Sequence, residues 1–118
     1  MELARRVGEA LADEARVKGI CLPFLRGIVL STSTDLASGC HVILAPTINI
    51  QRSPLGGRSF ESFSEDPFLN GTIAAAYING LQSKGVSATV KHFVANEQEF
   101  ERSFLHSEVS LRKKLNSG

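Results

Sequence analysis

HVILAPTINI, residues 41–50, and VSATVKHF, residues 86–93, decide the fold expected for this chain of 118 residues. Both segments are rich in Val, Ile and Thr, which favour β-strands. Residues 67–84 lie between them and have the apolar spacing of a helix. A strand, a helix and a second strand predict a crossover unit with parallel strands, so the segments that leave the two carboxyl ends emerge on one face.

A polar cluster follows each predicted strand. QRSPLGGRSFESFSED occupies residues 51–66, and residues 91–102 read KHFVANEQEFER. Because both clusters leave from the same face, the topology predicts that four basic or imidazole side chains meet in one pocket. These are Arg58, Lys91, His92 and Arg102.

Two helices are predicted around these strands. Leu3, Val7, Leu11 and Ala15 recur every four residues, which gives the first helix one apolar stripe, and Gly19 is a plausible end for it. The second helix has Asp66 as a capping residue and Pro67 at its first position. Its apolar period continues through the Asn-Gly pair at 79–80, which therefore does not form a turn, and the helix stops before Gly85. A third helix is expected to start near Ser107.

Composition restricts the partners and the compartment. The chain carries 13 Lys and Arg against 12 Asp and Glu, so no field of one sign favours nucleic acid or a membrane surface. Cys21 and Cys40 are expected to be free thiols, although a bridge between them is possible. Residues 1–11 show an amphipathic helical pattern rather than a secretory signal, which slightly favours the cytoplasm.

Arg58 and the Lys91-His92 pair each have an ordinary structural interpretation beside the binding one. The guanidinium of Arg58 follows a tight Gly-Gly turn and suits adjacent acceptors such as sugar hydroxyls, but it can instead pair with Glu61 or Glu65 and stiffen the loop. Lys91 and His92 can donate to ligand hydroxyls, or they can form a solvated strand end. On a regular strand the two would point to opposite faces.

The acidic residues and histidines do not form a recognisable catalytic or metal motif. Glu97, Glu99 and Glu101 crowd one loop and are expected to be solvated or paired with Arg102, rather than to act as the two separated carboxylates of a glycosidase. The histidines lack the HExxH spacing and neither cysteine lies in a CxxC pair, so no metal site is predicted.

Residues 41–71 and 85–102 resemble the N-terminal barrel domain of glycoside hydrolase family 3 β-glucosidases. The resemblance rests on HVILAPTINIQRSPLGGRSFESFSEDPFLNG and GVSATVKHFVANEQEFER. It implies an α/β fold that is part of a (β/α)₈ TIM-like barrel, with about two βα units in this chain. It also implies that Arg58, Lys91, His92 and Arg102 are substrate-binding residues for a terminal glucose, and that no cofactor is needed.

The resemblance implies a retaining, exo-acting β-glucosidase that acts on β-glucosides or short β-glucan oligosaccharides. The family's nucleophile, an aspartate in a Ser-Asp-Trp context, has no counterpart here, because the chain has no tryptophan. No residue of this chain is therefore assigned as catalytic. The remaining domains of a full-length enzyme are expected as partners, and the alternative is an inert truncated product with no independent function.

Two segments depart from the family pattern. Ile20–Gly39 separates the first helix from the first strand, which are nearly contiguous in the family, and is interpreted as a non-homologous insertion. Residues 103–118 match only weakly. A small doubly wound ligand-binding domain is a further alternative, but it requires more strands than this sequence provides.

Overall fold

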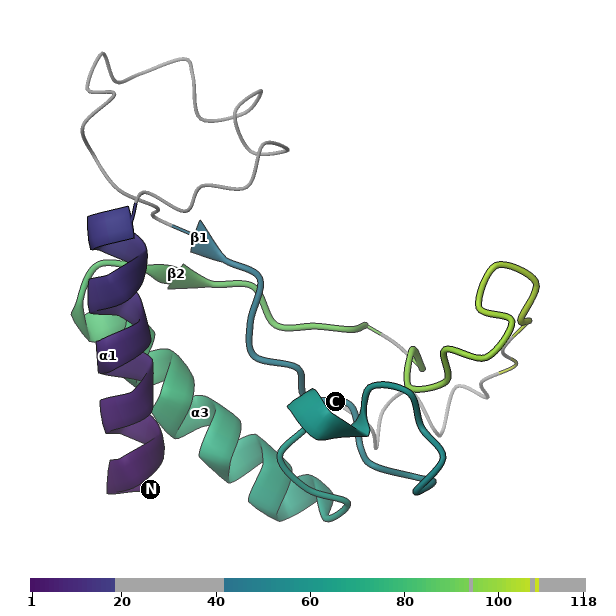
Figure 1. Ribbon diagram of the computed structural model, residues 1–118. Helices are drawn as coiled ribbons and strands as arrows, with labels where there is room; N and C mark the ends of the chain where they lie inside the picture. The colour runs from purple at the N-terminus through teal and green to yellow at the C-terminus, as the bar shows by residue number, and fades with distance from the viewer. Residues whose placement is uncertain (19–41, 94, 107, 109–118) are drawn as a thin grey trace.

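The computed structural model describes residues 1–18, 42–93, 95–106 and 108, which form an α/β arrangement of two helices and two short strands (Figure 1). Along the chain these are α1 (Glu2–Lys18), β1 (Val42–Ile43), the 3₁₀ turn η2 (Ser59–Glu61), α3 (Pro67–Ser83) and β2 (Ser87–Ala88). Neither helix in these residues is long and apolar enough to cross a lipid bilayer.

Several expectations fall on parts of the chain that the structure does not describe. They concern the end of the first helix at Gly19, the two cysteines, the proposed insertion Ile20–Gly39, and a third helix from Ser107.

β1 and β2 pair in parallel, as the crossover predicted. Val42 lies opposite Ser87 and Ile43 opposite Ala88. Beyond the strands, Ile48 N donates to Lys91 O at 2.8 Å and Lys91 N donates to Pro46 O at 3.1 Å. The direction was predicted correctly, but the strands are much shorter than residues 41–50 and 86–93. Pro46 has no N–H to donate, so the ladder is interrupted and only an isolated bridge joins Thr47 to Lys91.

α3 begins and ends as its capping residues predict. The Asp66 carboxylate accepts a hydrogen bond from Leu69 N at 2.8 Å, and Pro67 occupies the first turn. The helix continues through residues 79 and 80 and ends at Ser83. Gly85 then adopts a φ of 76°, a conformation that favours glycine, before the chain enters β2.

α1 and α3 pack so closely that glycine is required at their contact. A Cβ atom on Gly8 would lie 2.2 Å from the Tyr77 carbonyl oxygen, and one on Gly80 would lie 2.1 Å from the Arg5 carbonyl oxygen. Buried side chains from α1, from α3 and from the residue that precedes β2 surround this contact and form the core, namely Ala12, Tyr77, Leu81 and Val86.

The buried side of α1 differs from the apolar stripe expected from the sequence. Ala15, a member of the expected stripe, and Ala12 face the interior, whereas Leu3 is 73% exposed and Val7 and Leu11 are also exposed. Only small side chains of α1 are buried, because its backbone approaches that of α3 closely at Gly8 and Gly80. The helix itself was predicted correctly, but only Ala15 of its expected stripe is buried.

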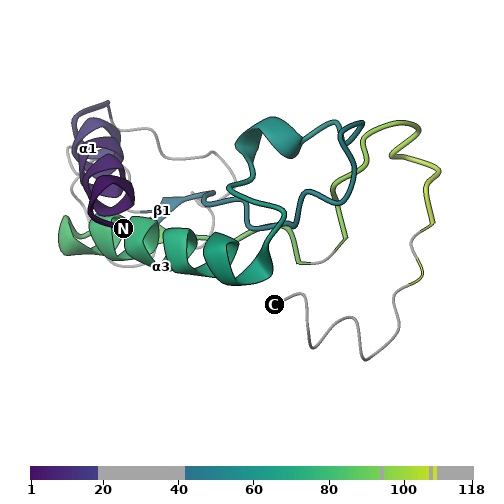
Figure 2. The ribbon, with the colours of Figure 1, turned by 90° about the horizontal axis from the view of Figure 1, so that it is seen from below.

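The two strands lead away from the helix pair toward the polar loops. In Figures 1 and 2, the segments after β1 and β2 run in the same direction, and η2 and residues 95–106 lie beyond the carboxyl ends of the strands, away from α1. The polar residues of both clusters therefore lie on one side of the molecule.

Candidate functional site

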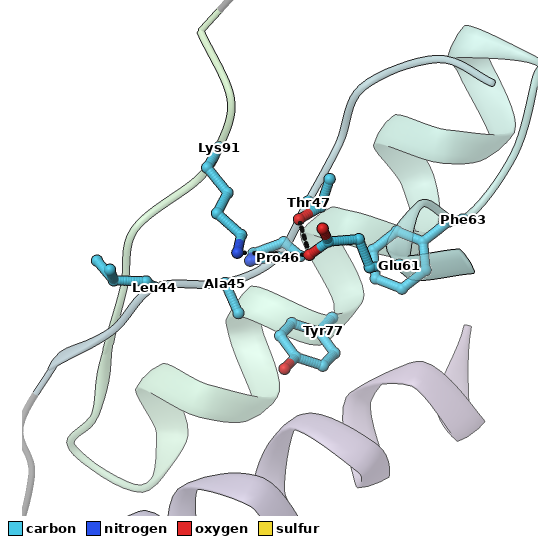
Figure 3. Close-up of a pocket in the computed structure, with 8 residues that line it drawn as sticks. All are labelled: Leu44, Ala45, Pro46, Thr47, Glu61, Phe63, Tyr77 and Lys91. Carbon is cyan, nitrogen blue, oxygen red and sulfur yellow. Dashed lines mark hydrogen bonds and ion pairs between the residues drawn. The ribbon is translucent and has the colours of Figure 1, made fainter. Parts of the chain in front are cut away.

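The Glu61 carboxylate is a central acceptor at this end of the strands. It accepts a hydrogen bond from Thr47 Oγ1 at 2.8 Å and lies 3.4 Å from Lys91 Nζ (Figure 3). It is also bonded to Arg58 Nε. The hydrogen bond from Arg58 lowers the pKa of Glu61 to about 2, and a hydrogen bond from Thr47 and the charge of Lys91 contribute to this shift. Glu61 is therefore an anion at neutral pH.

A second carboxylate, Glu99, joins the two predicted arginines. Its Oε1 lies 3.8 Å from Arg58 Nη1 and its Oε2 lies 3.4 Å from Arg102 Nη1. Gly57 packs against this side chain, since a Cβ atom there would lie 2.7 Å from Glu99 Cβ. Arg58 is held between two carboxylates with its side chain 23% exposed, while Arg102 is 69% exposed at the rim.

His92 is held by Asn49, which follows β1. Asn49 Oδ1 accepts a hydrogen bond from the His92 backbone N at 2.7 Å and lies 3.2 Å from His92 Nδ1, while Asn49 Nδ2 donates to His92 O at 3.1 Å. Burial, followed by the charges of Arg58 and Lys91, lowers the pKa of His92. With Nδ1 donating to Asn49, the neutral ring presents Nε2 as an acceptor.

The predicted site residues thus lie in one region, and the structural alternative for Arg58 also describes part of it. Arg58, Lys91 and Arg102 are connected through Glu61 and Glu99, and His92 is adjacent to Lys91 in the chain. The pairing of Arg58 with Glu61 was the structural alternative, and it is present. Glu99 does pair with Arg102, as expected. That all four side chains bind one ligand remains a prediction.

Three features of the site were not predicted from the sequence, namely the roles of Thr47 and Asn49 and the central position of Glu61. Thr47 and Asn49 are both buried and both support the site through side-chain hydrogen bonds. The signal available was their spacing, because polar residues two positions apart at a strand end lie on the same face. Glu61 was considered only as a partner of Arg58.

A pocket of about 210 Å³ lies beside Glu61. Figure 3 shows Lys91 extending toward Glu61 and Thr47 on one side, with Ala45, Phe63 and Tyr77 below. The Phe63 and Tyr77 rings have centroids 5.9 Å apart. The pocket therefore has a charged rim and an apolar floor. Lys91 lines it, while Arg58, His92 and Arg102 lie outside its lining.

Within the part of the chain that the structure describes, no group of three or more His, Cys, Asp or Glu side chains is placed to hold a metal ion. The donors gathered here are instead cationic and amide groups, which suit neutral or anionic oxygen atoms of a ligand.

Comparison with known sequences decides the family. Residues 30–111, more than half of the chain, match the sequence model of the glycosyl hydrolase family 3 N-terminal domain. The chain belongs to this family. Beta-glucosidase B of Emericella nidulans is 48% identical over 112 residues, covering 95% of this chain and 11% of that protein. The probable beta-glucosidase I of Aspergillus niger is 61% identical over 78 residues, covering 66% of this chain and 10% of that protein.

Solved structures of family members show the same arrangement. Beta-glucosidase 3B from Thermotoga neapolitana, in complex with glucose, superposes with a TM-score of 0.63 at 43% identity and covers 83% of this chain and 11% of that chain. The Bifidobacterium adolescentis GH3 beta-glucosidase gives a TM-score of 0.66 at 42% identity, covering 86% of this chain and 12% of that chain. The chain thus spans roughly a tenth of the family members it matches.

Proposed function

We propose that this chain supplies part of the sugar-binding floor of a retaining, exo-acting β-glucosidase. The enzyme would hydrolyse terminal β-D-glucosyl residues of β-glucosides or short β-glucan oligosaccharides and release glucose. The chain would form about two βα units of a (β/α)₈ barrel, and the remaining parts of the enzyme would complete it. Membership of a family whose solved members include glucose complexes supports this proposal.

The observation that carries the proposal is the group of cations beyond two adjacent parallel strands. Arg58, Lys91 and Arg102 share the carboxylates of Glu61 and Glu99, which leaves one positive charge in excess. Arginine has five N–H donors and lysine three, so each retains donors after its ion pair is made. Such a surface suits neighbouring hydroxyl groups on a sugar ring.

His92 extends this surface with a different chemistry. In the tautomer that Asn49 selects, Nε2 of the neutral ring can accept a hydrogen bond from a sugar hydroxyl. The adjacent Lys91 ammonium would also favour the ionised form of a carboxylate nucleophile brought near it. Hydroxyl recognition and nucleophile activation would then be supported from the same short segment.

The carboxylates at this site do not fit the roles of nucleophile or general acid. Glu61 is ionised and bonded to Thr47, Lys91 and Arg58, so it cannot donate a proton at working pH. Glu99 is paired with Arg58 and Arg102. In our proposal, both catalytic carboxylates come from other parts of the enzyme, and this chain binds and orients the glucosyl ring.

The test is substitution of Arg58 in the complete polypeptide that contains these residues. Arg58→Ala should lower kcat/KM for a chromogenic β-glucoside by roughly 10- to 100-fold, since a hydrogen bond from a charged group contributes about 1.5–3 kcal/mol. Arg52→Ala is the matched control: it removes the same charge from an arginine that is 62% exposed and pairs with Glu97. Equal losses in the two variants would contradict the proposal.

The proposal also implies that this chain alone is catalytically inert. The absence of tryptophan from the sequence supports this, because the family's nucleophile motif requires one. The same assay on the 118-residue chain should show no turnover above the buffer rate. Reproducible turnover that Arg58→Ala abolishes would contradict the assignment of both catalytic carboxylates to other parts of the enzyme.

A further inference from the structure

The Glu61 side chain connects its own loop to the segments that follow β1 and β2. Thr47 follows β1, Arg58 lies in the loop before η2, and Lys91 follows β2, yet all three donate to this one carboxylate. The Glu61 side chain is only 21% exposed, so water has limited access to replace these donors. One anion therefore sets the relative positions of two of the proposed sugar-binding cations.

The two oxygen atoms of Glu61 divide these contacts. Oε1 is bonded to Arg58 Nε, whereas Oε2 accepts from Thr47 Oγ1 at 2.8 Å and faces Lys91 Nζ at 3.4 Å. Thr47 is buried and its backbone bridges to Lys91. The hydroxyl thus fixes the orientation of the carboxylate, and the oriented carboxylate fixes the two cations.

Lys91 needs such an anchor more than Arg58 does. A lysine side chain is a flexible four-carbon stem with a strongly hydrated charge, and it adopts many rotamers unless an acceptor holds it. Arg58 has a second partner in Glu99, with Nη1 and Oε1 3.8 Å apart. The Lys91 ammonium pairs with Glu61, with Nζ and Oε2 3.4 Å apart. Neutralising Glu61 should therefore release Lys91 first.

We infer that Glu61 is a positioning residue of the sugar site, whose carboxylate holds Lys91 and Arg58 where their remaining N–H groups can bind ring hydroxyls. This inference rests on the proposed function of those two residues. Glu61 itself makes no contact with the sugar in this scheme. Its contribution to hydrolysis passes through the cations, which a double-mutant cycle can detect.

The first measurement compares Glu61→Gln with Glu97→Gln in the complete polypeptide. Both changes replace a carboxylate by an amide of the same shape, and both remove an anion whose side chain is mostly buried, at 21% and 17% exposure. Glu61→Gln should lower kcat/KM by roughly 10- to 100-fold per folded enzyme, raise KM, and weaken inhibition by glucose. Glu97→Gln, which affects only the pair with Arg52, should stay within about twofold.

A structural role for Glu61 would give a different pattern. The amount of folded enzyme would fall, but KM and the glucose inhibition constant of the folded fraction would not change. Folded enzyme is counted by far-ultraviolet circular dichroism and gel filtration. If Glu61→Gln does not fold, Glu61→Asp keeps the charge but withdraws it by one methylene, and a wild-type KM in that variant would overturn the inference.

The second measurement is a cycle of Glu61→Gln with Lys91→Met. If Glu61 acts through Lys91, the double variant loses less activity than the product of the two single losses. Losses that multiply would overturn the inference. In the control cycle of Glu97→Gln with Lys91→Met, the two losses of activity should multiply. Should Lys91→Met alone leave glucoside hydrolysis unchanged, the proposed function fails; a loss in Lys91→Met with none in Glu61→Gln refutes only the positioning role.

Discussion

The helix pair and the polar cluster beyond the strands are held together by different forces. α1 and α3 meet through glycine backbones and a few fully buried side chains, where contact distances leave no free space. The polar cluster is held by ion pairs whose side chains are 21–26% exposed at Arg58, Glu61, Glu99 and Lys91. Steric fit therefore specifies the fold, while charge arranges the groups proposed to bind sugar.

Both regions leave apolar side chains uncovered. Leu3 and Val17 in α1 are 73% and 87% exposed, and Phe60, Phe93 and Phe104 beyond the strands are each more than 85% exposed. Exposed phenylalanines in such number are typical of surfaces that another part of a protein covers. This supports the proposal that the loops belong to a larger enzyme.

The largest expected effect is the loss of stability when the helix contact is filled. Gly80→Ala would place a Cβ 2.1 Å from the Arg5 carbonyl oxygen, a backbone atom that cannot rotate away. Overpacking of this kind costs about 1–3 kcal/mol or more, and it outweighs the gain of about 1 kcal/mol in helix propensity. Thermal unfolding followed by circular dichroism measures it.

Gly71→Ala is the matched control in the same helix. A Cβ there meets nothing within 4 Å, so only the propensity gain of roughly 1 kcal/mol remains. Gly71→Ala should raise the melting temperature and Gly80→Ala should lower it. Shifts of the same sign would show that the helix contact is looser than the glycine geometry indicates.

The sequence predicted this half of the molecule well in outline. Asp66, Pro67 and Gly85 mark the limits of α3 because capping depends on local geometry that short motifs encode. The parallel direction of the strands also followed from the order of the elements. Which side of α1 is buried could not be read from apolar spacing, since the close approach at Gly8 and Gly80 depends on both helices together.

The location of the polar cluster was predictable from the sequence, but some of the ion pairs within it were not. Strand ends placed Arg58, Lys91 and Arg102 on one side, and the structure connects them. The pairs of Arg58 with Glu61 and of Arg102 with Glu99 join residues three positions apart and were anticipated. The pairs of Lys91 with Glu61 and of Arg58 with Glu99 join different segments, so the sequence did not predict them. The strand lengths were overestimated because β-branched residues continue past Pro46, whereas the hydrogen-bond ladder between the strands is interrupted there.

A smaller effect is expected from the charge of Glu61, and it should depend on pH. The folded pKa of Glu61, about 2, lies below its ordinary value of 4.5, so the ionised group stabilises the fold above pH 4.5 and loses this contribution as the pH falls toward 2. Wild type should therefore exceed Glu61→Gln in unfolding free energy by about 1–2 kcal/mol at pH 7.

The two proteins should approach each other in stability as the pH falls to 2, where the Glu61 carboxyl group of the wild type is protonated in the unfolded state and about half protonated in the folded state. Urea unfolding at several pH values measures the difference directly. A difference that stays constant from pH 7 to pH 2 would mean that the ion pairs around Glu61 do not contribute to the fold, and the polar cluster would then be purely a binding feature.

The smallest expected effect lies at Asp66, where the polar loop passes into α3. Asp66→Ala removes the acceptor of the 2.8 Å hydrogen bond from Leu69 N and should cost about 1 kcal/mol, while Asp66→Asn keeps an acceptor and should lose only a few tenths through the helix dipole. Because the cap stabilises the helix without contacting Arg58 or Glu61, KM for a β-glucoside should be unchanged in both variants. A raised KM in Asp66→Ala alone would mean that the start of α3 positions the preceding loop, and that the two regions are mechanically coupled.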